Sequence, residues 1–219
     1  MVVRAVLAVA CACSLAGCAS AESSGSASAD IAKVADVKSS FGPEFHVTSI
    51  APTGIDPKLL AAQKLPDGLK FEPPECAKVA VAPVVPPGLQ GNMAAVSAEG
   101  DGNRFIALAV ETSQPVPVND PGGACQKVGF AGGAVRGVIE VVDAPHIAGT
   151  RTLGVHRIVQ TVVDGKPRTG ELYDYSAHFG NYQVIVTANP LVLPDKPVVP
   201  VNTQRARDLL TTAVAAVRS

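Results

Sequence analysis

The pattern of apolar and polar positions predicts a chain of short strands framed by helices. Alternating or β-branched apolar runs, which are typical of half-buried strands, occupy residues 44–50, 92–98, 104–112, 134–142, 152–163, 167–177 and 182–188. The turn-forming sequences EGDGN (99–103), DGKP (164–167) and Gly180-Asn181 join several of these runs. Because two-residue turns with Asn, Asp and Gly favour hairpins, we expect an antiparallel β-meander.

Four other segments have helical spacing or helix-start signals. They are residues 30–41, the segment opened by Asp56-Pro57 and ending near 65, the segment opened by Pro73-Pro74-Glu75, and residues 202–217. In the last of these, six apolar residues share one face: Ala206, Leu209, Leu210, Ala213, Val214 and Val217. Pro190–Pro200 is rich in proline and valine, which favours an extended strap. Helices with one apolar face cover sheets of this kind, so the predicted class is α+β.

The first residues, MVVRAVLAVACACSLAGCAS, have the features of an export signal. Arg4 precedes an apolar run from Ala5 to Leu15, and small residues follow. A charged start, a short apolar stretch and a small-residue exit are typical of a secretory signal peptide, and the run is shorter than the ~20 residues that span a bilayer. We predict a signal peptide over residues 1–17.

Leu15-Ala16-Gly17-Cys18 resembles the lipobox of bacterial lipoproteins. The resemblance implies cleavage before Cys18, a diacylglyceryl thioether on its sulfur, and palmitate-like acyl chains that hold the protein at the outer face of the cell membrane. Two or more acyl chains anchor a protein stably, whereas one gives only marginal binding. Residues 18–30 are rich in Ser, Ala and Gly and are expected to form a flexible tether. A single domain is expected over 31–219.

Two cysteines remain in the predicted mature chain besides the lipidated Cys18. They are Cys76, in PPECAKV, and Cys125, in PGGACQK. In an exported protein an even pair favours a disulfide bond. The alternative is two free thiols or a redox pair, although the CxxC spacing of redox pairs is missing.

The composition excludes several classes of function. The net charge is −1, with no run of five basic residues, so no nucleic-acid partner is expected. The chain has six Phe, three Tyr and no Trp, too few for the aromatic platforms that sugars and single strands usually need. The motifs GxSxG, HExxH, SxxK, GxGxxG and the P-loop are missing. We therefore predict no catalytic residue, no metal site and no cofactor.

One group of polar residues remains on two neighbouring predicted strands. Asp174, Ser176 and His178 share a face of one strand, and His156 lies on the other. Asp174 and His178 are four residues apart, about 13 Å along a strand, which is too far to share a metal ion. An odd register of the DGKP turn would bring His156 to Asp174, and an even one would place it among Tyr173 and Tyr175.

Tyr173, Tyr175 and Tyr182 fall on one face of the last hairpin, together with Ala177 and Phe179. Packing in the core accounts for them. The alternative is the wall of a ligand pocket, because tyrosines present an apolar body and a polar tip. His156 would join them in this candidate pocket.

The layout as a whole resembles a family of proteins. This layout is similar to that of mycobacterial and actinobacterial lipoproteins of uncharacterised function. The shared features are a lipobox, a small-residue tether, an early helix, a cysteine in a Pro-started helix, a second cysteine past mid-chain, a meander and a final helix ending LLTTAVAAV. Their globular domains are similar to the extracellular sensor domain of the mycobacterial Ser/Thr kinase PknH. The resemblance implies an antiparallel sheet flanked by helices, a ligand cleft and a place outside the plasma membrane. The sensor domain has more disulfides than the single pair available here.

These observations favour a lipid-anchored, extracytoplasmic binding or sensor-like domain without catalytic activity. The expected partners are the membrane, through the lipid anchor, and an unidentified small-molecule, lipid or protein ligand. A carrier of lipids or glycolipids of the cell envelope is the first alternative, and it requires an apolar cavity. A hydrolase using His156 or His178 is the second, and it requires a polar cleft with a perturbed histidine.

Overall fold

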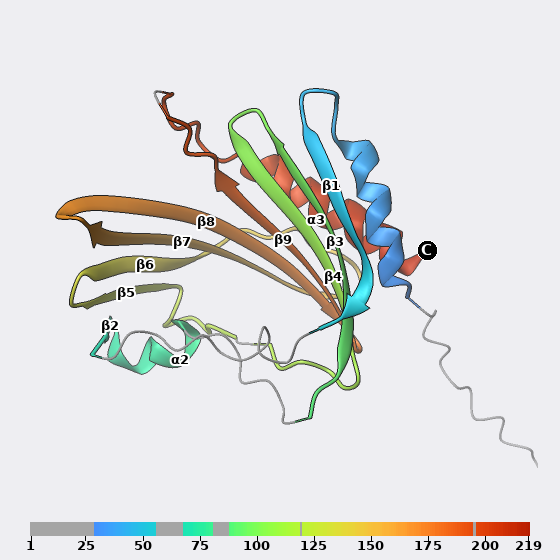
Figure 1. The fold of residues 1–219 in the computed structure, drawn as a ribbon. Helices are drawn as coiled ribbons and strands as arrows, with labels where there is room; N and C mark the ends of the chain where they lie inside the picture. The colour runs from blue at the N-terminus through green and yellow to red at the C-terminus, as the bar shows by residue number, and fades with distance from the viewer. Residues whose placement is uncertain (1–28, 56–67, 81–87, 119, 195) are drawn as a thin grey trace, which may run out of the picture.

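The computed structural model describes residues 29–55, 68–80, 88–118, 120–194 and 196–219. These residues form one nine-stranded antiparallel sheet with two longer helices on one face (Figure 1). The strands are β1 (His46–Gly54), β2 (Lys70–Glu72), β3 (Gly91–Gly100), β4 (Asn103–Thr112), β5 (Lys127–Gly132), β6 (Val135–Val142), β7 (Arg151–Val163), β8 (Lys166–Phe179) and β9 (Tyr182–Pro190). The helices are η1 (Ile31–Ser40), η2 (Pro74–Cys76), α2 (Ala77–Ala80) and α3 (Thr203–Arg218), of which η1 and η2 are 3₁₀ helices. The predicted α+β class is confirmed.

The order of strands across the sheet is β1-β3-β4-β9-β8-β7-β6-β5-β2. The consecutive hairpins from β5 to β9 form the predicted meander, and β3–β4 forms a second hairpin. The sequence pattern did not predict that β9 returns beside β4, nor that β2 closes the far edge. Both pairings join segments distant in the chain, and local patterning carries no signal for them.

Tight turns set the register of the long hairpins. Asp164 and Gly165 both have positive φ, 51° and 72°, and Val163 pairs directly with Lys166. Gly180 has φ 56°, and Phe179 pairs with Tyr182. Positive φ at a two-residue turn matches the right-handed twist of the flanking strands, so both hairpin predictions are confirmed.

The helices begin at side-chain caps and bury one face. The Asp30 carboxylate accepts from the Ala32 amide, 2.9 Å away, and the Asn202 side chain accepts from the Arg205 amide at 3.0 Å. In α3 the buried residues are Ala206, Leu209, Leu210, Ala213, Val214 and Val217, the six that the sequence pattern predicted. The helix predicted over 30–41 is η1, and the one predicted from Pro73 is η2 with α2.

The core lies between these two helices and one half of the sheet. It contains small and branched residues of β3, β4, β8 and β9, including Ala94, Val96, Ala107, Ala109, Ala177, Val184 and Val186. The many alanines let the helices approach the sheet closely, and each buried Val or Leu contributes about 1.5–3 kcal/mol. Helix η1 packs on β1, β3 and β4, while α3 packs on β4, β8 and β9. The sheet extends well beyond them through β7, β6, β5 and β2 (Figure 1).

Several predictions concern parts of the chain outside the described residues. These are the signal peptide, Cys18, the tether as far as residue 28, and the helix expected over 56–65. In the described part of the structure, no helix is both long and apolar enough to cross a membrane.

Candidate functional site

A hollow of about 540 Å³ lies on the half of the sheet that the long helices leave uncovered. Lys70, Phe71, Glu72, Gly129, Phe130, Ala131, Arg136, Gly137, Val138, Ile158, Gln160 and Thr169 line it. Its volume is within the range of small-molecule sites, about 300–1,000 Å³. The hollow is therefore the candidate site.

The strand register explains how distant residues meet there. Cα pairing places Glu72, Gly129, Val138, Ile158 and Glu171 in one row across β2, β5, β6, β7 and β8. Side chains alternate between faces along a strand, so this row shares the face of Tyr175, which packs in the core with α3. The hollow is thus a continuation of the helix-covered face.

The middle of this row is apolar. Val138 is half-buried, and Ile158 remains 38% exposed. Gly129 has space beside it, because a Cβ built there would meet only the Glu72 carbonyl, at 3.8 Å. Two branched side chains beside a glycine produce an apolar depression in the sheet surface.

The next row on the same face is polar and cationic. It contains Lys70, Ala131, Arg136, Gln160 and Thr169. Arg136 Nε donates to Gln160 Oε1 at 2.6 Å, and Gln160 Nε2 donates to Thr169 Oγ1 at 3.4 Å. Among the described residues, neither Lys70 nor Arg136 has a carboxylate within ion-pair distance. Positive charge therefore lines one end of the hollow.

Two stacked rings lie in the next row beyond Ile158, outside the residues that line the hollow. His156 pairs with Tyr173 across β7 and β8, and their ring centroids are 4.0 Å apart. His156 Nε2 lies 2.9 Å from a carboxylate oxygen of Glu171, the residue that pairs with Ile158. Burial raises the pKa of Tyr173, and the charge of Glu171 raises it further. Of the two registers left open by the sequence, the structure has the one that places His156 among the tyrosines.

The three tyrosines of the candidate pocket lie in different surroundings. Tyr173 stacks on His156 in the row beyond Ile158, while Tyr175 is 1% exposed within the core. Tyr182 lies at the β8–β9 turn, where it stacks on Phe179 and donates to Glu111 at 3.0 Å. Only Tyr173 and His156 are brought together next to the hollow. The lining residues of β2 and β5 were missed, because neither strand has a run long enough to show alternation.

The other polar group suggested by the sequence lies on the opposite face of the sheet. Asp174 accepts from Thr187 at 3.0 Å and lies 3.6 Å from Arg157. Burial raises the pKa of Asp174, and the positive charge of Arg157 opposes that shift. His156 does not join this group, because Asp174 pairs with Val155.

His178, on the same face as Asp174, is held neutral. Burial, together with the charge of Arg151, lowers the pKa of His178 to about 4. Its Nε2 lies 3.3 Å from the Ser176 hydroxyl and from the Gln183 amide. A histidine with so low a pKa is a weak base, and among the described residues no carboxylate is bonded to its ring. The arrangement lacks the third group that orients a catalytic histidine.

A disulfide bond holds the outer wall of the hollow. Cys76 and Cys125 are bonded, with Cα atoms 5.5 Å apart, as the sequence predicted. The bond ties η2, which follows β2, to the loop that enters β5. Because β2 has only three residues and lies at the sheet edge, this cross-link keeps Lys70 and Glu72 in place.

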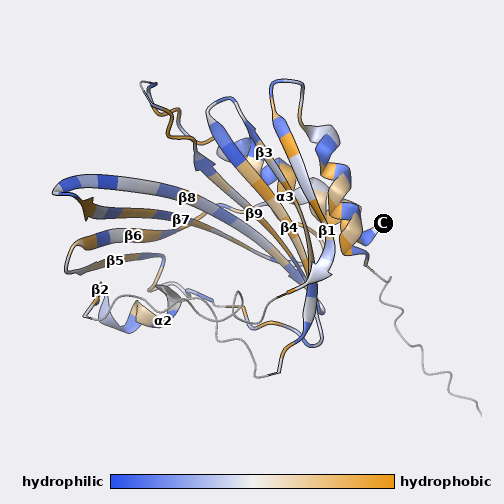
Figure 2. Cartoon of the chain, viewed as in Figure 1, coloured by the Kyte–Doolittle hydropathy of each residue, from blue (hydrophilic) through white to orange (hydrophobic). Residues whose placement is uncertain are grey.

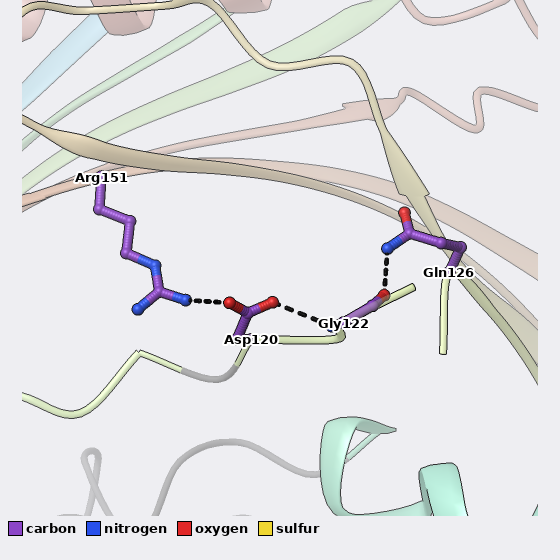
Figure 3. Close-up of polar contacts among 4 residues, drawn as sticks. All are labelled: Asp120, Gly122, Gln126 and Arg151. Atoms are coloured by element: carbon purple, nitrogen blue, oxygen red, sulfur yellow. Dashed lines mark hydrogen bonds and ion pairs between the residues drawn. The ribbon is translucent and has the colours of Figure 1, made fainter. Parts of the chain in front are cut away.

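Polar contacts fix the same loop to the sheet (Figure 3). Arg151, at the start of β7, forms an ion pair with Asp120 at 2.7 Å. The other oxygen of Asp120 accepts from the Gly122 amide at 2.9 Å, and Gln126 donates to the Gly122 carbonyl. The loop that carries Cys125 is thus joined to β7 at Asp120 and cross-linked within itself between Gly122 and Gln126.

Residues 30–218 match a protein family described as a domain of unknown function, DUF5642, and the chain belongs to this family. An X-ray structure of an uncharacterised protein of Mycobacterium smegmatis, the Rv0999 orthologue, is 65% identical and superposes with a TM-score of 0.82. The match covers 88% of this chain and 98% of that one, so a relative with little beyond this region folds by itself.

A second solved structure has a weaker likeness. The extracellular domain of PknH from Mycobacterium tuberculosis is 13% identical, with a TM-score of 0.35 over 84% of this chain and 90% of that one. A likeness at this level carries no argument about function. No curated protein matches the chain. The predicted resemblance to mycobacterial proteins of uncharacterised function is confirmed.

Proposed function

We propose that this member of the DUF5642 family is a lipid-anchored, extracytoplasmic binding domain that takes a ligand in the hollow over β2, β5, β6 and β7. It acts as a sensor-like or presenting module and has no catalytic activity of its own. The observation that carries the proposal is the hollow itself, an apolar depression with Lys70 and Arg136 in one row and Glu72 in the next.

The disulfide supports a place outside the cytoplasm. Disulfide bonds persist in oxidising compartments and are rare in the cytosol, and Cys76 and Cys125 are bonded. The predicted signal peptide and lipobox point to the same compartment, and Cys18 provides the anchor.

The shape of the sheet supports ligand binding rather than packing alone. Helices η1 and α3 bury one half of this face, whereas Ile158 on the other half is 38% exposed. A concave, mostly apolar site with a few polar groups is the usual form of a small-molecule site. The disulfide and the Arg151–Asp120 ion pair hold the wall in advance of binding, which lowers the entropic cost of binding.

A hydrolase is the least supported of the three functions. His156 bonds to Glu171 and stacks on Tyr173, but no serine, threonine or cysteine is bonded to its ring among the described residues. His178 bonds to Ser176, but its low pKa makes it a poor general base at neutral pH.

A carrier of lipids or glycolipids is the second candidate. The apolar row through Val138 and Ile158 favours it, because acyl chains bind such surfaces. The two functions differ in the fate of the ligand, since a carrier must release it to a second membrane or enzyme.

Native mass spectrometry of residues 29–219, exported and purified from an actinobacterial host, tests the proposal. We expect a co-purified mass that leaves when the protein is denatured. A clean mass of the polypeptide, short by two hydrogens for the disulfide, would contradict a resident ligand in the hollow.

Metabolic labelling with a palmitate analogue tests the anchor. We expect the wild-type chain to carry the label and the Cys18→Ser variant to lose it. Cys13→Ser is the matched control, because Cys13 would leave with the signal peptide, and it should keep the label. Equal labelling of the Cys18→Ser variant and the wild type would contradict the lipobox.

A further inference from the structure

From the charges around the hollow we infer that its ligand is an acidic amphiphile, with an alkyl chain on Val138 and Ile158 and its carboxylate or phosphate between Lys70 and Arg136. This inference rests on the proposed function and specifies the class of ligand.

The two cations are arranged to hold one anion. Lys70 pairs with Ala131, and Ala131 pairs with Arg136, so the cations lie on either side of a small residue. Both are among the lining residues of the hollow. Gln160 accepts from Arg136 Nε, which orients the guanidinium and leaves its two terminal nitrogens for a ligand. Such a nitrogen pair binds carboxylate and phosphate in a bidentate manner.

The carboxylates of the site lie one row away from the cations. Glu72 is on β2 and Glu171 on β8, at the two edges of the row whose centre is Val138 and Ile158. Glu171 is already bonded to His156. The centre of the hollow therefore offers apolar contact, and positive charge is concentrated at the Lys70 end.

The separation of the cations from the apolar row sets the orientation of the ligand in the hollow. Successive residues on one face of a strand are about 6.6 Å apart. The chain of a ligand held at Arg136 lies over Val138 and Ile158 and runs towards the row of His156 and Tyr173, which is the next row beyond the lining residues. A neutral or cationic amphiphile would leave Lys70 and Arg136 without a partner.

Three probes with the same chain test the charge preference: decanoate, decan-1-ol and decyltrimethylammonium. Residues 29–219 are titrated with each at neutral pH and low salt, and binding is followed by two-dimensional NMR. We expect decanoate to bind about five- to tenfold more tightly than decan-1-ol, the cation to bind most weakly, and decyl phosphate to behave like decanoate. The ratio of the affinity for the acids to the affinity for decan-1-ol should decrease as the salt concentration rises, because salt screens the attraction between the acidic group and the two cations.

Substitutions test whether Lys70 and Arg136 are the residues that bind the acidic group. Lys70→Gln combined with Arg136→Gln should reduce the affinity for decanoate to that for decan-1-ol and leave the latter unchanged. Arg168→Gln is the matched control, because Arg168 is an exposed arginine on β8 on the opposite face, and it should bind like the wild type.

The outcomes separate the inference from the proposed function. Equal affinity of the wild type for decanoate and decan-1-ol would overturn the acidic ligand but leave a binding hollow. If no probe binds while a mass still co-purifies, the amphiphile is wrong and a ligand exists. If no probe binds and no mass co-purifies, both fail.

Discussion

The imidazole ring of His156 lies parallel to the phenol ring of Tyr173, with centroids 4.0 Å apart and planes 6° apart. This contact follows from the two-residue turn at Asp164-Gly165, which fixes the β7–β8 register. Glu171 bonds to His156, and Glu171 also raises the pKa of the neighbouring Tyr173. The three side chains thus form one polar cluster beside Ile158, the residue that lines the hollow and pairs with Glu171.

The tyrosines should ionise at a higher pH than free tyrosine does. Burial is the main cause that raises the pKa of Tyr173, Tyr175 and Tyr182. Nearby carboxylates raise the pKa of Tyr173 and Tyr182 further, whereas Arg207 and Thr203 partly oppose the rise at Tyr175. These are all the tyrosines of the chain. Spectrophotometric titration should show tyrosinate appearing above the ordinary midpoint near pH 10, and stability should fall as the pH rises beyond it. A midpoint at or below the value of free tyrosine would contradict the burial of these rings.

Acidification should weaken the fold through His178. Its pKa is about 4 in the folded protein and 6.5 when unfolded. The unfolded state therefore binds the proton first, and stability is lost as the pH falls from 6.5 towards 4. With allowance for partial exposure, the loss is on the order of 2 kcal/mol.

The His178→Gln variant isolates this effect. Asp174, whose pKa is raised, acts in the opposite direction, because protonation favours its buried form, and it is unchanged in the variant. Urea unfolding at pH 7 and pH 4.5 should show a smaller loss of stability in the variant than in the wild type. An equal loss in both would show that His178 is not buried and neutral.

Loss of the disulfide should destabilise the domain and loosen β2. For a sequence separation of 49 residues, replacing both Cys76 and Cys125 with Ser should cost about 4 kcal/mol in the chain-entropy model. Denaturant unfolding measures the loss, and the reduced wild type is the control. Hydrogen exchange should become faster at Lys70–Glu72 through local opening, in addition to the faster exchange through global unfolding that affects all amides, α3 included. Faster exchange in α3 but not in β2 would contradict a local role for the bond.

Part of this architecture could be predicted from the sequence. The β7–β8 and β8–β9 hairpins follow from Asp164-Gly165 and Gly180-Asn181, and the buried face of α3 follows from its 3.6-residue period. The Cys76–Cys125 bond follows from the two cysteines left when the predicted signal peptide and the lipidated Cys18 are set aside.

The hollow could not be predicted, because it depends on pairings between distant segments. Lys70 and Arg136 are 66 positions apart and meet only because β2 pairs with β5. The three-residue β2 shows no period, and Gly129 and Gly132 interrupt the apolar pattern of β5. The class of the helix at 31–40 also escaped prediction, although its buried residues Ile31, Val34 and Val37 recur every third residue, which is the period of a 3₁₀ helix.

The central claim, a ligand held in this hollow, is tested most directly by filling it. Gly129→Leu would place a side chain into the hollow with no backbone clash, since a Cβ there meets only the Glu72 carbonyl at 3.8 Å. Gly170→Leu is the matched control, because Gly170 is a β8 glycine on the opposite face with nothing within 4 Å of its Cβ position. Native mass spectrometry of both variants and the wild type should show the co-purified mass in the wild type and Gly170→Leu and its loss in Gly129→Leu. A mass retained equally by Gly129→Leu would place the ligand elsewhere and contradict the account.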